Sequence, residues 1–550
     1  MKKRNGMCPF CYAKSLAEAK KAKNGNVPVL YNTQPYGNDM AKTPPMGWSS
    51  WNTFQEKINQ DVVEQTAVEM KRLGLVDAGY VYLNIDDCWE AKERNLKGEL
   101  EADYAAFPLG MARLAEKVNE QGMKLGIYSS NGLLTCQDFP ASLGFEYRDA
   151  YTFARWGVEY WKLDFCHHVD YTQYAPLVAG IAVSEPGKAP EKIIGCKEGV
   201  CSGYARVFRS GFRFKRSRHD NQTLPFHASG LDGGKGAITF TVHAEKDGDY
   251  VLTVYTHERY SYEKFLGILV NNETLLTVKI PPDIRWNEYA TQKIVRLRQG
   301  ANTLKLFNPI LNPATSDMLQ YQYAGCCIKQ ATADYARDSG GEEKKIVFSL
   351  CEWGAGKPYL WGASAGNLWR TTGDIEATWK SIMEIYEQNV VLYEYAGPGG
   401  FNDPDMLEVG NGELTCDENT AHFALWCMMA APLILGNDIR VMPPEVLEIV
   451  TNPRLIAIDQ DTLGKQAKRI VKGDTDVLVK PLSGGTALCV LNKKDSRSAY
   501  SVDENLLFRD KYIHYKPGEK ALDALTGSWI DKKTALSGDL APHSVKVFIL

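Results

Sequence analysis

The 550-residue sequence lacks the features that define several large classes of protein. Its longest apolar stretch, FALWCMMAAPLILG at 423–436, is too short to span a bilayer and contains Pro432. A net charge of only −4 argues against nucleic acid or a charged membrane surface as a partner. No apolar run follows the basic residues of the N-terminal MKKRNGMCPFC, which predicts no secretory signal and a cytoplasmic location.

Metal-binding and nucleophile motifs are also sparse. The 13 cysteines are odd in number and thinly spread, which favours a reducing compartment over a disulfide framework. Cys8 and Cys11 form a CxxC without the second pair of a zinc site; we interpret them as reduced thiols, with half a zinc site or a redox pair as alternatives. The chain has no HExxH and no GxSxG, and NDPD at 402–405 lacks the glycine of an EF-hand loop. We therefore expect no metal and no cofactor.

What the sequence does contain is a repeated alternation of β-rich runs with amphipathic helical stretches. Four such units lie between Met46 and about residue 170, and four more lie between about 330 and 460. Strands that alternate with helices indicate parallel βα units. Eight strands in about 250 residues are typical of a (β/α)8 TIM barrel.

Between these flanks, and again near the C-terminus, the pattern changes to period two. Runs such as GAITFTVHA and DYVLTVYTH, joined by polar turns, indicate antiparallel β-sandwiches. We interpret the basic run RSGFRFKRSRH, at 209–219, as a solvated strand face rather than a nucleic-acid patch. The predicted order is an N-terminal arm at 1–40, half a barrel at 41–175, an inserted β-sandwich at 176–330, the second half-barrel at 331–465 and a C-terminal β-sandwich at 466–550.

Charged residues collect at the predicted carboxyl ends of the barrel strands. In WGVEYWKLDFC, at 156–166, Lys162 and Asp164 share one face because side chains alternate along a strand. Barrel enzymes hold their catalytic groups at this end of the strands, and a structural ion pair is the alternative. Other strand ends carry Asp86, Asp87, Tyr128, Arg370, Asp374, Asp403 and Asp405, with Trp51, Trp89, Trp353 and Trp369 nearby.

Carboxylates and aromatic rings together suit a polyhydroxylated ring as ligand. Carboxylates accept hydrogen bonds from vicinal hydroxyls, and aromatic rings pack against the apolar face of a sugar. Without a metal or a serine nucleophile, paired carboxylates favour glycoside hydrolysis.

At these residues the sequence resembles glycoside hydrolase family 27, the α-galactosidase and α-N-acetylgalactosaminidase family. The stretches that carry the resemblance run in the family's order over both barrel flanks: TPPMGWSSWNTF, YLNIDDCW, KLGIYS, GVEYWKLDFC, CEWG, WRTTGDI, GPGGFNDPDM, MAAPLILGNDI and LGKQ. The inserted segment departs from the family pattern. Through GLDGGKGAITF and its later strands it distantly resembles a family 35 carbohydrate-binding module.

The resemblance implies a retaining exo-glycosidase with Asp164 as nucleophile and Asp374 as general acid/base. Lys162 is expected to favour the ionised form of Asp164. The family often joins the residues that match Cys136 and Cys166 by a disulfide; we expect a bond that can form but is not essential. The implied substrate-binding residues are Trp51, Asp86, Asp87, Tyr128, Cys136, Lys162, Cys166, Cys351, Glu352, Trp353, Arg370, Asp405 and Met406.

The same resemblance favours galactose as the sugar. Glu352 and Trp353 stand where small residues would admit an N-acetyl group, and Asp86 rather than a longer glutamate leaves room for a hydroxymethyl group. The alternatives are an α-N-acetylgalactosaminidase, a β-L-arabinopyranosidase, a transglycosylase and a catalytically silent galactoside-binding protein. We expect an oligosaccharide as the partner, with a homo-oligomer left open, and Trp286, Tyr260 and Tyr262 as candidate aromatic platforms of the insertion.

Overall fold

The computed structural model describes residues 35–169, 175–209, 224–258, 264–280, 287–310, 313–513, 515–516 and 518–550. The CxxC at Cys8 and Cys11, the basic run beyond residue 209, and the aromatic residues Trp286, Tyr260 and Tyr262 lie outside the described residues. Residues 175–319 belong to one compact unit, and 35–168 with 320–550 belong to a second. None of the described helices is long and apolar enough to cross a membrane.

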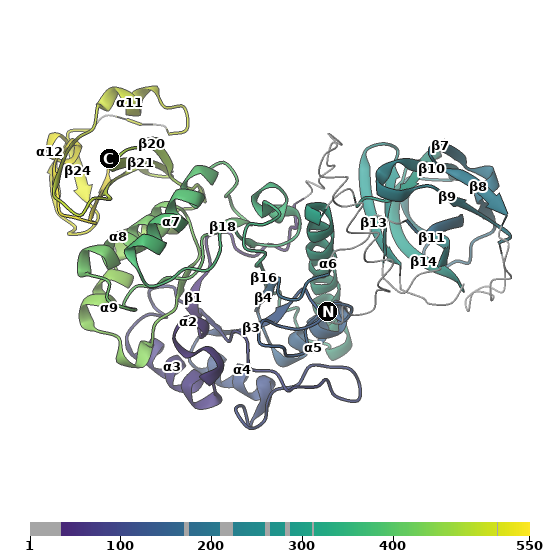
Figure 1. The fold of residues 1–550 in the computed structure, drawn as a ribbon, viewed down its shortest axis with the longest axis horizontal. Coiled ribbons are helices and arrows are strands. Elements are labelled where there is room, and N and C mark those ends of the chain that lie inside the picture. The colour runs from purple at the N-terminus through teal and green to yellow at the C-terminus, as the bar shows by residue number, and fades with distance from the viewer. Residues whose placement is uncertain are drawn as a thin grey trace, which may run out of the picture. The chain divides into compact units, whose positions relative to one another are not determined.

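The second unit contains the predicted barrel (Figure 1). All pairings in its eight-stranded sheet are parallel, and Leu407 bridges to Leu435 so that the two ends of the sheet meet. The TIM barrel is therefore confirmed. Its strands, in spatial order, are β18 (Phe401–Asp403), β17 (Leu368–Arg370), β16 (Val347–Leu350), β4 (Tyr160–Asp164), β3 (Lys124–Ser130), β2 (Tyr82–Asn84), β1 (Met46–Ser49) and β19 (Leu433–Leu435).

Helices lie outside the strands, as Figure 1 shows. Strand β4 shows how side chains alternate between the outer helices and the barrel interior. The Trp161 ring is fully buried and packs edge-on against Phe153 of α5, with ring centroids 4.9 Å apart. Its neighbours Lys162 and Asp164 consequently face inward. The helices are α3 (Gln60–Arg72), α4 (Gly110–Glu120), α5 (Glu146–Trp156), α6 (Pro313–Ser339), α7 (Trp379–Asn389), α8 (Cys416–Met428), α9 (Pro444–Val450) and α10 (Pro453–Asp459), with short α2 (Trp51–Phe54) after β1.

Helix α6 runs across the position where the sequence analysis divides insertion from barrel. It begins at Pro313 and continues without a break to Ser339. The Tyr321 hydroxyl donates to the backbone oxygen of Asp164 at 3.2 Å, so this helix supports the carboxyl end of β4.

The first unit is a β-sandwich, as predicted for the insertion. Its hydrophobic core holds buried side chains from both sheets, among them Phe240, Leu252 and Leu304. One sheet contains β13 (Thr274–Ile280), β12 (Lys264–Val270), β15 (Gly300–Phe307), β10 (Gly236–Ala244) and β7 (Val200–Gly203); the other contains β14 (Asn287–Leu297), β11 (Gly248–Glu258), β5 (Leu177–Ser184), β9 (Phe226–Ser229), β8 (Arg206–Arg209) and β6 (Ile193–Gly195). The likeness to a carbohydrate-binding module stays a prediction.

The C-terminal β-domain packs on the barrel helices. Asp476 is fully buried and accepts a hydrogen bond from the Tyr386 hydroxyl of α7 at 2.9 Å, while Arg469 lies 2.9 Å from the same carboxylate. The Tyr386 hydrogen bond joins the domain to the barrel, and Arg469, from the same domain as Asp476, compensates the buried carboxylate. The main sheet runs β20 (Lys468–Val471), β21 (Thr475–Leu482), β22 (Gly485–Asn492), β27 (Val545–Ile549), β24 (Lys520–Asp523) and β25 (Trp529–Asp531), and β23 (Ser498–Ser501) pairs with β26 (Ser537–Leu540).

Candidate active site

A pocket of about 460 Å³ opens at the carboxyl ends of the barrel strands. Its volume lies in the range of small-molecule binding sites. The structure brings most of the predicted site residues together in its lining: Trp51, Asp86, Asp87, Tyr128, Cys136, Lys162, Asp164, Trp353, Arg370, Asp374, Asp405 and Met406.

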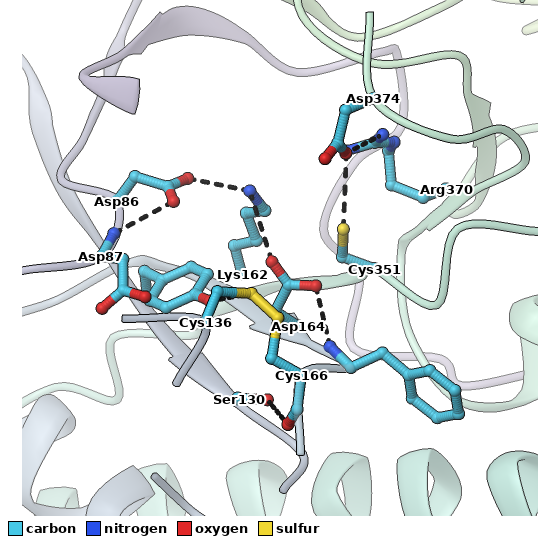
Figure 2. Close-up of polar contacts among 12 residues, drawn as sticks. Asp86, Asp87, Ser130, Cys136, Lys162, Asp164, Cys166, Cys351, Arg370 and Asp374 are labelled. Carbon is cyan, nitrogen blue, oxygen red and sulfur yellow. Dashed lines mark hydrogen bonds and ion pairs between the residues drawn. A yellow bond between two sulfur atoms is a disulfide. The ribbon is translucent and has the colours of Figure 1, made fainter. Parts of the chain in front are cut away.

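Lys162 stands at the centre of the site, between two carboxylates (Figure 2). Its Nζ atom lies 2.8 Å from Oδ2 of Asp86 and 3.9 Å from Oδ2 of Asp164. The ammonium also lies 5.3 Å from the centre of the Tyr128 ring, which suits a cation–π contact. Lys162 therefore fixes the positions of both acids relative to the strand end.

Asp164 is 5% exposed and accepts a hydrogen bond from the backbone N–H of Phe165 at 2.8 Å. Burial raises the pKa of this carboxyl, and the Lys162 charge opposes the rise without cancelling it. As expected, the Lys162 charge lowers the pKa of Asp164 and so favours its ionised form. The net direction of the pKa is nevertheless upward, because few groups compensate for the water that Asp164 loses.

Asp374 has a contrasting environment. Its side chain is 76% exposed, and Arg370 Nη2 lies 2.8 Å from its Oδ1 atom. Partial burial raises the pKa of Asp374, but the Arg370 charge and hydrogen bond outweigh it and the net direction is downward. The net pKa shifts of the two predicted catalytic acids are therefore opposite, upward for Asp164 and downward for Asp374. Figure 2 shows Asp374 across the site from Asp86.

Arg370 links Asp374 to the end of β18. It is 3% exposed, and its Nη2 atom also lies 3.0 Å from Oδ2 of Asp405. Asp405 has a φ of +86° and accepts hydrogen bonds from the backbone N–H groups of Met406 and Ile375, at 2.8 and 2.9 Å. Nearby, burial raises the pKa of Asp403 to about 6.

Asp87 anchors the loop that carries Cys136. Its carboxylate accepts hydrogen bonds from the backbone N–H groups of Cys88 and Gln137, at 2.8 and 3.0 Å, while burial raises its pKa to about 6. Cys136 is joined to Cys166 by a disulfide, with the Cα atoms 5.0 Å apart. The bridge ties the loops after β3 and β4 together, and Cys166 itself does not line the pocket.

The CEW turn presents only one of its three side chains to the pocket. Trp353, with a φ of +55°, lines it. Cys351 is fully buried and accepts a weak hydrogen bond from Arg370 at 3.5 Å. Glu352 is fully buried and turned away, accepting from the backbone N–H of Gly356 at 2.7 and 3.0 Å, and burial raises its pKa to about 8. Any effect of this turn on a substituent at carbon 2 therefore falls to Trp353.

The sequence analysis missed one part of the pocket lining. These residues lie in loops and short helical turns beyond the strand ends, where periodicity gives no signal, although Asn52 and Ile375 belong to the stretches TPPMGWSSWNTF and WRTTGDI. They are Asn52, Gln55, Ile375, Glu376, Ala377, Glu408, Asn411 and Gly412.

One group of side chains in the described part of the chain has the spacing of a metal site. The ligand atoms of Cys136, Asp164 and Cys166 lie within 4.8 Å of one another. Because the two sulfurs are bonded to each other, neither offers a thiolate to an ion.

Paired acidic side chains at the mouth of a barrel, with a lysine and an arginine beside them, suit the class of barrel enzymes that hydrolyse glycosides. Residues 43–183 and 322–461 match the family model for α-galactosidase A. The chain therefore belongs to this family, part of glycoside hydrolase family 27.

Individual relatives and solved structures support the same family assignment. The chain is 32% identical to an α-galactosidase of Cyamopsis tetragonoloba over 87% of its own length and 80% of the relative's. A solved structure of a Bacteroides fragilis protein assigned as an α-galactosidase/melibiase is 28% identical, with a TM-score of 0.62 over 93% of this chain and 80% of that one. The structure of α-galactosidase I from Mortierella vinacea shares the fold, with a TM-score of 0.62, 22% identity and coverage of 93% and 98%.

Removing the disulfide tests its contribution to stability. Cys136 and Cys166 close a loop with a sequence separation of 30 residues. A loop of this size predicts that a Cys136→Ser, Cys166→Ser double variant loses about 3.6 kcal/mol of unfolding free energy in non-reducing buffer. Urea titration followed by circular dichroism measures the loss. Cys416→Ser, which removes an exposed free thiol, is the control. A double variant as stable as wild type without reductant would show that the bridge adds no stability.

Proposed function

We propose that this protein is a retaining exo-glycosidase that removes terminal α-linked galactose from oligosaccharides or glycoconjugates. The observation that carries the proposal is the position of Lys162, which holds Asp86 and Asp164 together in a pocket that Asp374 borders from the other side. Membership of the α-galactosidase A family and the named relatives support galactose as the sugar.

In the first step Asp164 attacks the anomeric carbon while Asp374 protonates the departing oxygen. The nucleophile needs an ionised carboxylate, which the neighbouring Lys162 charge favours. The acid needs a proton, whereas Arg370 holds Asp374 ionised in the free enzyme. A bound substrate covers this exposed carboxyl and engages Arg370 through a sugar hydroxyl; both changes raise the pKa of Asp374 and prepare it to donate.

In the second step Asp374 acts as a base. Once the leaving group has gone, water reaches Asp374 again and the carboxylate regains Arg370 as a partner. It then takes a proton from a water that attacks the glycosyl-enzyme on the face opposite Asp164, which releases galactose with its original anomeric configuration.

The remaining residues bind and orient the sugar. Asp86, with its carboxylate already on Lys162, is suited to the hydroxyls on carbons 4 and 6, and Asp87 and Tyr128 complete that end. Arg370 and Asp405 are suited to the hydroxyls on carbons 2 and 3. Trp51, Trp353 and Met406 supply the apolar surface of the pocket.

The direct test compares three aryl glycosides as substrates. We expect hydrolysis of p-nitrophenyl α-galactoside, and much slower turnover of the matching α-N-acetylgalactosaminide and β-L-arabinopyranoside. Asp164→Asn, which cannot form the covalent bond, should abolish turnover while keeping the fold. Because Glu352 faces away from the pocket, a faster rate on the N-acetylated substrate would establish that the space beside Trp353 admits this group, and the galactose assignment would fall.

Azide separates the roles of the two acids. Asp374→Ala should lower the rate for alkyl galactosides by about 10²- to 10⁴-fold, and that for aryl galactosides less, because an aryl leaving group needs little protonation. Azide should rescue this variant and yield α-galactosyl azide, since it attacks the glycosyl-enzyme. With Asp164→Ala, direct displacement should instead yield the β anomer. NMR of the products distinguishes them, and the reverse pattern would exchange the assigned roles.

Lys162 should set the acidic limb of the pH–rate profile. The nucleophile works ionised, so activity rises as the pH passes through the pKa of Asp164. Lys162 lowers this pKa, so Lys162→Met should move the limb of kcat/KM to higher pH. Lys124→Met, which breaks an ion pair with Glu159 at the opposite end of β3, is the matched control and should leave the limb in place. A limb that does not move in Lys162→Met would mean that another group controls it.

A further inference from the structure

A small polar chamber lies inside the barrel, directly beneath the sugar pocket. Its volume is about 30 Å³, and part of its lining comes from within the strands, including Ser49, Asn84 and Asp403. Lys162 and Arg370 line both the chamber and the pocket above it. These two cations therefore separate the chamber from the sugar.

The chamber is more polar than the interior of a TIM barrel usually is. Bulky branched side chains fill that space in most barrels. Here, three pairs of register partners on adjacent strands present polar groups to it: Ser49 with Asn84, Lys162 with Ser349, and Arg370 with Asp403. Gly126 leaves room for one of them, because a Cβ at this position would collide with Oδ1 of Asn84.

Two buried polar atoms of the lining indicate what the chamber holds. Asn84 is 6% exposed and Arg370 is 3% exposed, and within the described part of the chain neither Asn84 Oδ1 nor Arg370 Nε has a hydrogen-bond partner. The first atom accepts a hydrogen bond and the second donates one. A bare cation or anion meets only one of these needs, whereas water meets both. Since about 10–15 Å³ is enough for one water, the chamber has room for about two.

Asp403 is an acidic group of this chamber that the mechanism above does not use. Its carboxylate accepts a hydrogen bond from the backbone N–H of Asp405 at 2.9 Å, and it lines the chamber but not the sugar pocket. Burial raises its pKa to about 6 against the opposing charges of Arg370 and Lys162. Near neutral pH, Asp403 therefore adds a negative charge on the side of both cations that faces away from the sugar.

The first step of the reaction moves negative charge from one cation to the other. Asp164 loses its charge when its carboxylate bonds to the anomeric carbon, and Asp374 becomes charged when its proton goes to the leaving oxygen. Asp164 lies beside Lys162, whereas Asp374 is the partner of Arg370. Lys162 thus loses a carboxylate partner while Arg370 gains one. A further carboxylate beneath both cations offsets this change.

We propose that ordered water in the chamber links Asp403 to Lys162 and Arg370, and that Asp403 is a positioning residue whose charge compensates Lys162 while the glycosyl-enzyme forms. Water suits this task because it can reorient as the charge moves, whereas the side chains that hold the sugar must stay in place. The inference rests on the proposed function and adds a residue that touches neither the sugar nor the leaving group.

The kinetic test uses Asp403→Asn, which keeps the shape of the side chain and removes its charge. Above about pH 7, kcat/KM for p-nitrophenyl α-galactoside should fall about tenfold, the effect of a charge interaction of one pKa unit. Below about pH 5, Asp403 is protonated in the wild-type protein, so both proteins carry a neutral group there and the ratio of their rates should approach one.

The other groups that face Asp403 are present in both proteins, so the ratio of rates reports on Asp403. They are Tyr160 and Lys162 of β4, Arg370 of β17, Asp86 after β2 and Asp405 after β18. Burial raises the pKa of Tyr160. For Lys162 and Arg370, burial acts downward, but the neighbouring carboxylates outweigh it and the net direction of the pKa is upward. These three groups consequently keep one charge state through the pH range of the test.

Asp459→Asn is the matched control. Asp459 is a fully buried carboxyl on α10, outside both the pocket and the chamber, and its removal should give the same ratio to wild type at every pH. The inhibition constant of free galactose should move less than twofold in Asp403→Asn. A loss of rate that does not depend on pH, an unchanged rate, or a larger shift in galactose binding would overturn the positioning role and leave the glycosidase assignment standing. If the wild-type protein does not cleave the galactoside, the proposed function fails and the positioning role with it.

A high-resolution crystal structure of the wild-type protein tests the chamber without any variant. We expect ordered water within hydrogen-bond distance of Asn84 Oδ1 and Arg370 Nε. A dry chamber, or one that holds an ion, would overturn the proposal whatever the kinetics show.

Discussion

The charge of Lys162 is the constraint on which the site depends. An ammonium group at the inner end of a barrel strand loses much of its hydration, and only nearby carboxylates compensate for that loss. Asp86 at 2.8 Å and Asp164 at 3.9 Å provide them. In turn, the charges of Lys162 and Arg370 offset the desolvation cost of these largely buried carboxylates. The cations and anions of the mouth are therefore mutually required, and removing one leaves the others without compensation.

This arrangement lets two aspartates carry different chemistry in one pocket. Asp164 is nearly inaccessible to water, and its partners are the strand, the Phe165 amide and Lys162. Asp374 is open to solvent and has Arg370 as a direct partner. A nucleophile benefits from a fixed position, whereas an acid/base must respond to whether a leaving group or water is next to it. Burial suits the first requirement and exposure suits the second.

The sequence was sufficient for the parts that follow from regular geometry. Period-two alternation places Lys162 and Asp164 on the inner face of β4, and the βα rhythm predicts all eight barrel strands. It failed where the backbone leaves regular geometry. Trp353 has a positive φ that turns Glu352 away from the pocket, and no periodicity encodes such a turn.

Other features could not be read from the sequence because they join separate segments. The pairing of Asn52 with Glu408 connects positions 356 residues apart. Likewise, α6 crosses the expected boundary at residue 330 because its helical pattern continues without a break, whereas that boundary followed the end of the strand pattern.

The tolerance of a long insertion after β4 has a local explanation. The end of this strand is held from three directions before the chain leaves the barrel. The backbone oxygen of Asp164 accepts from the Asn131 N–H at 2.7 Å and from Tyr321 of α6 at 3.2 Å, and the carbonyl of Cys166 accepts from Ser130 at 2.8 Å. With the disulfide to Cys136, these bonds fix the nucleophile through β3, α6 and the adjoining loop. The position of Asp164 is consequently set by its neighbours in the barrel, and the sequence beyond residue 168 is free to carry another domain.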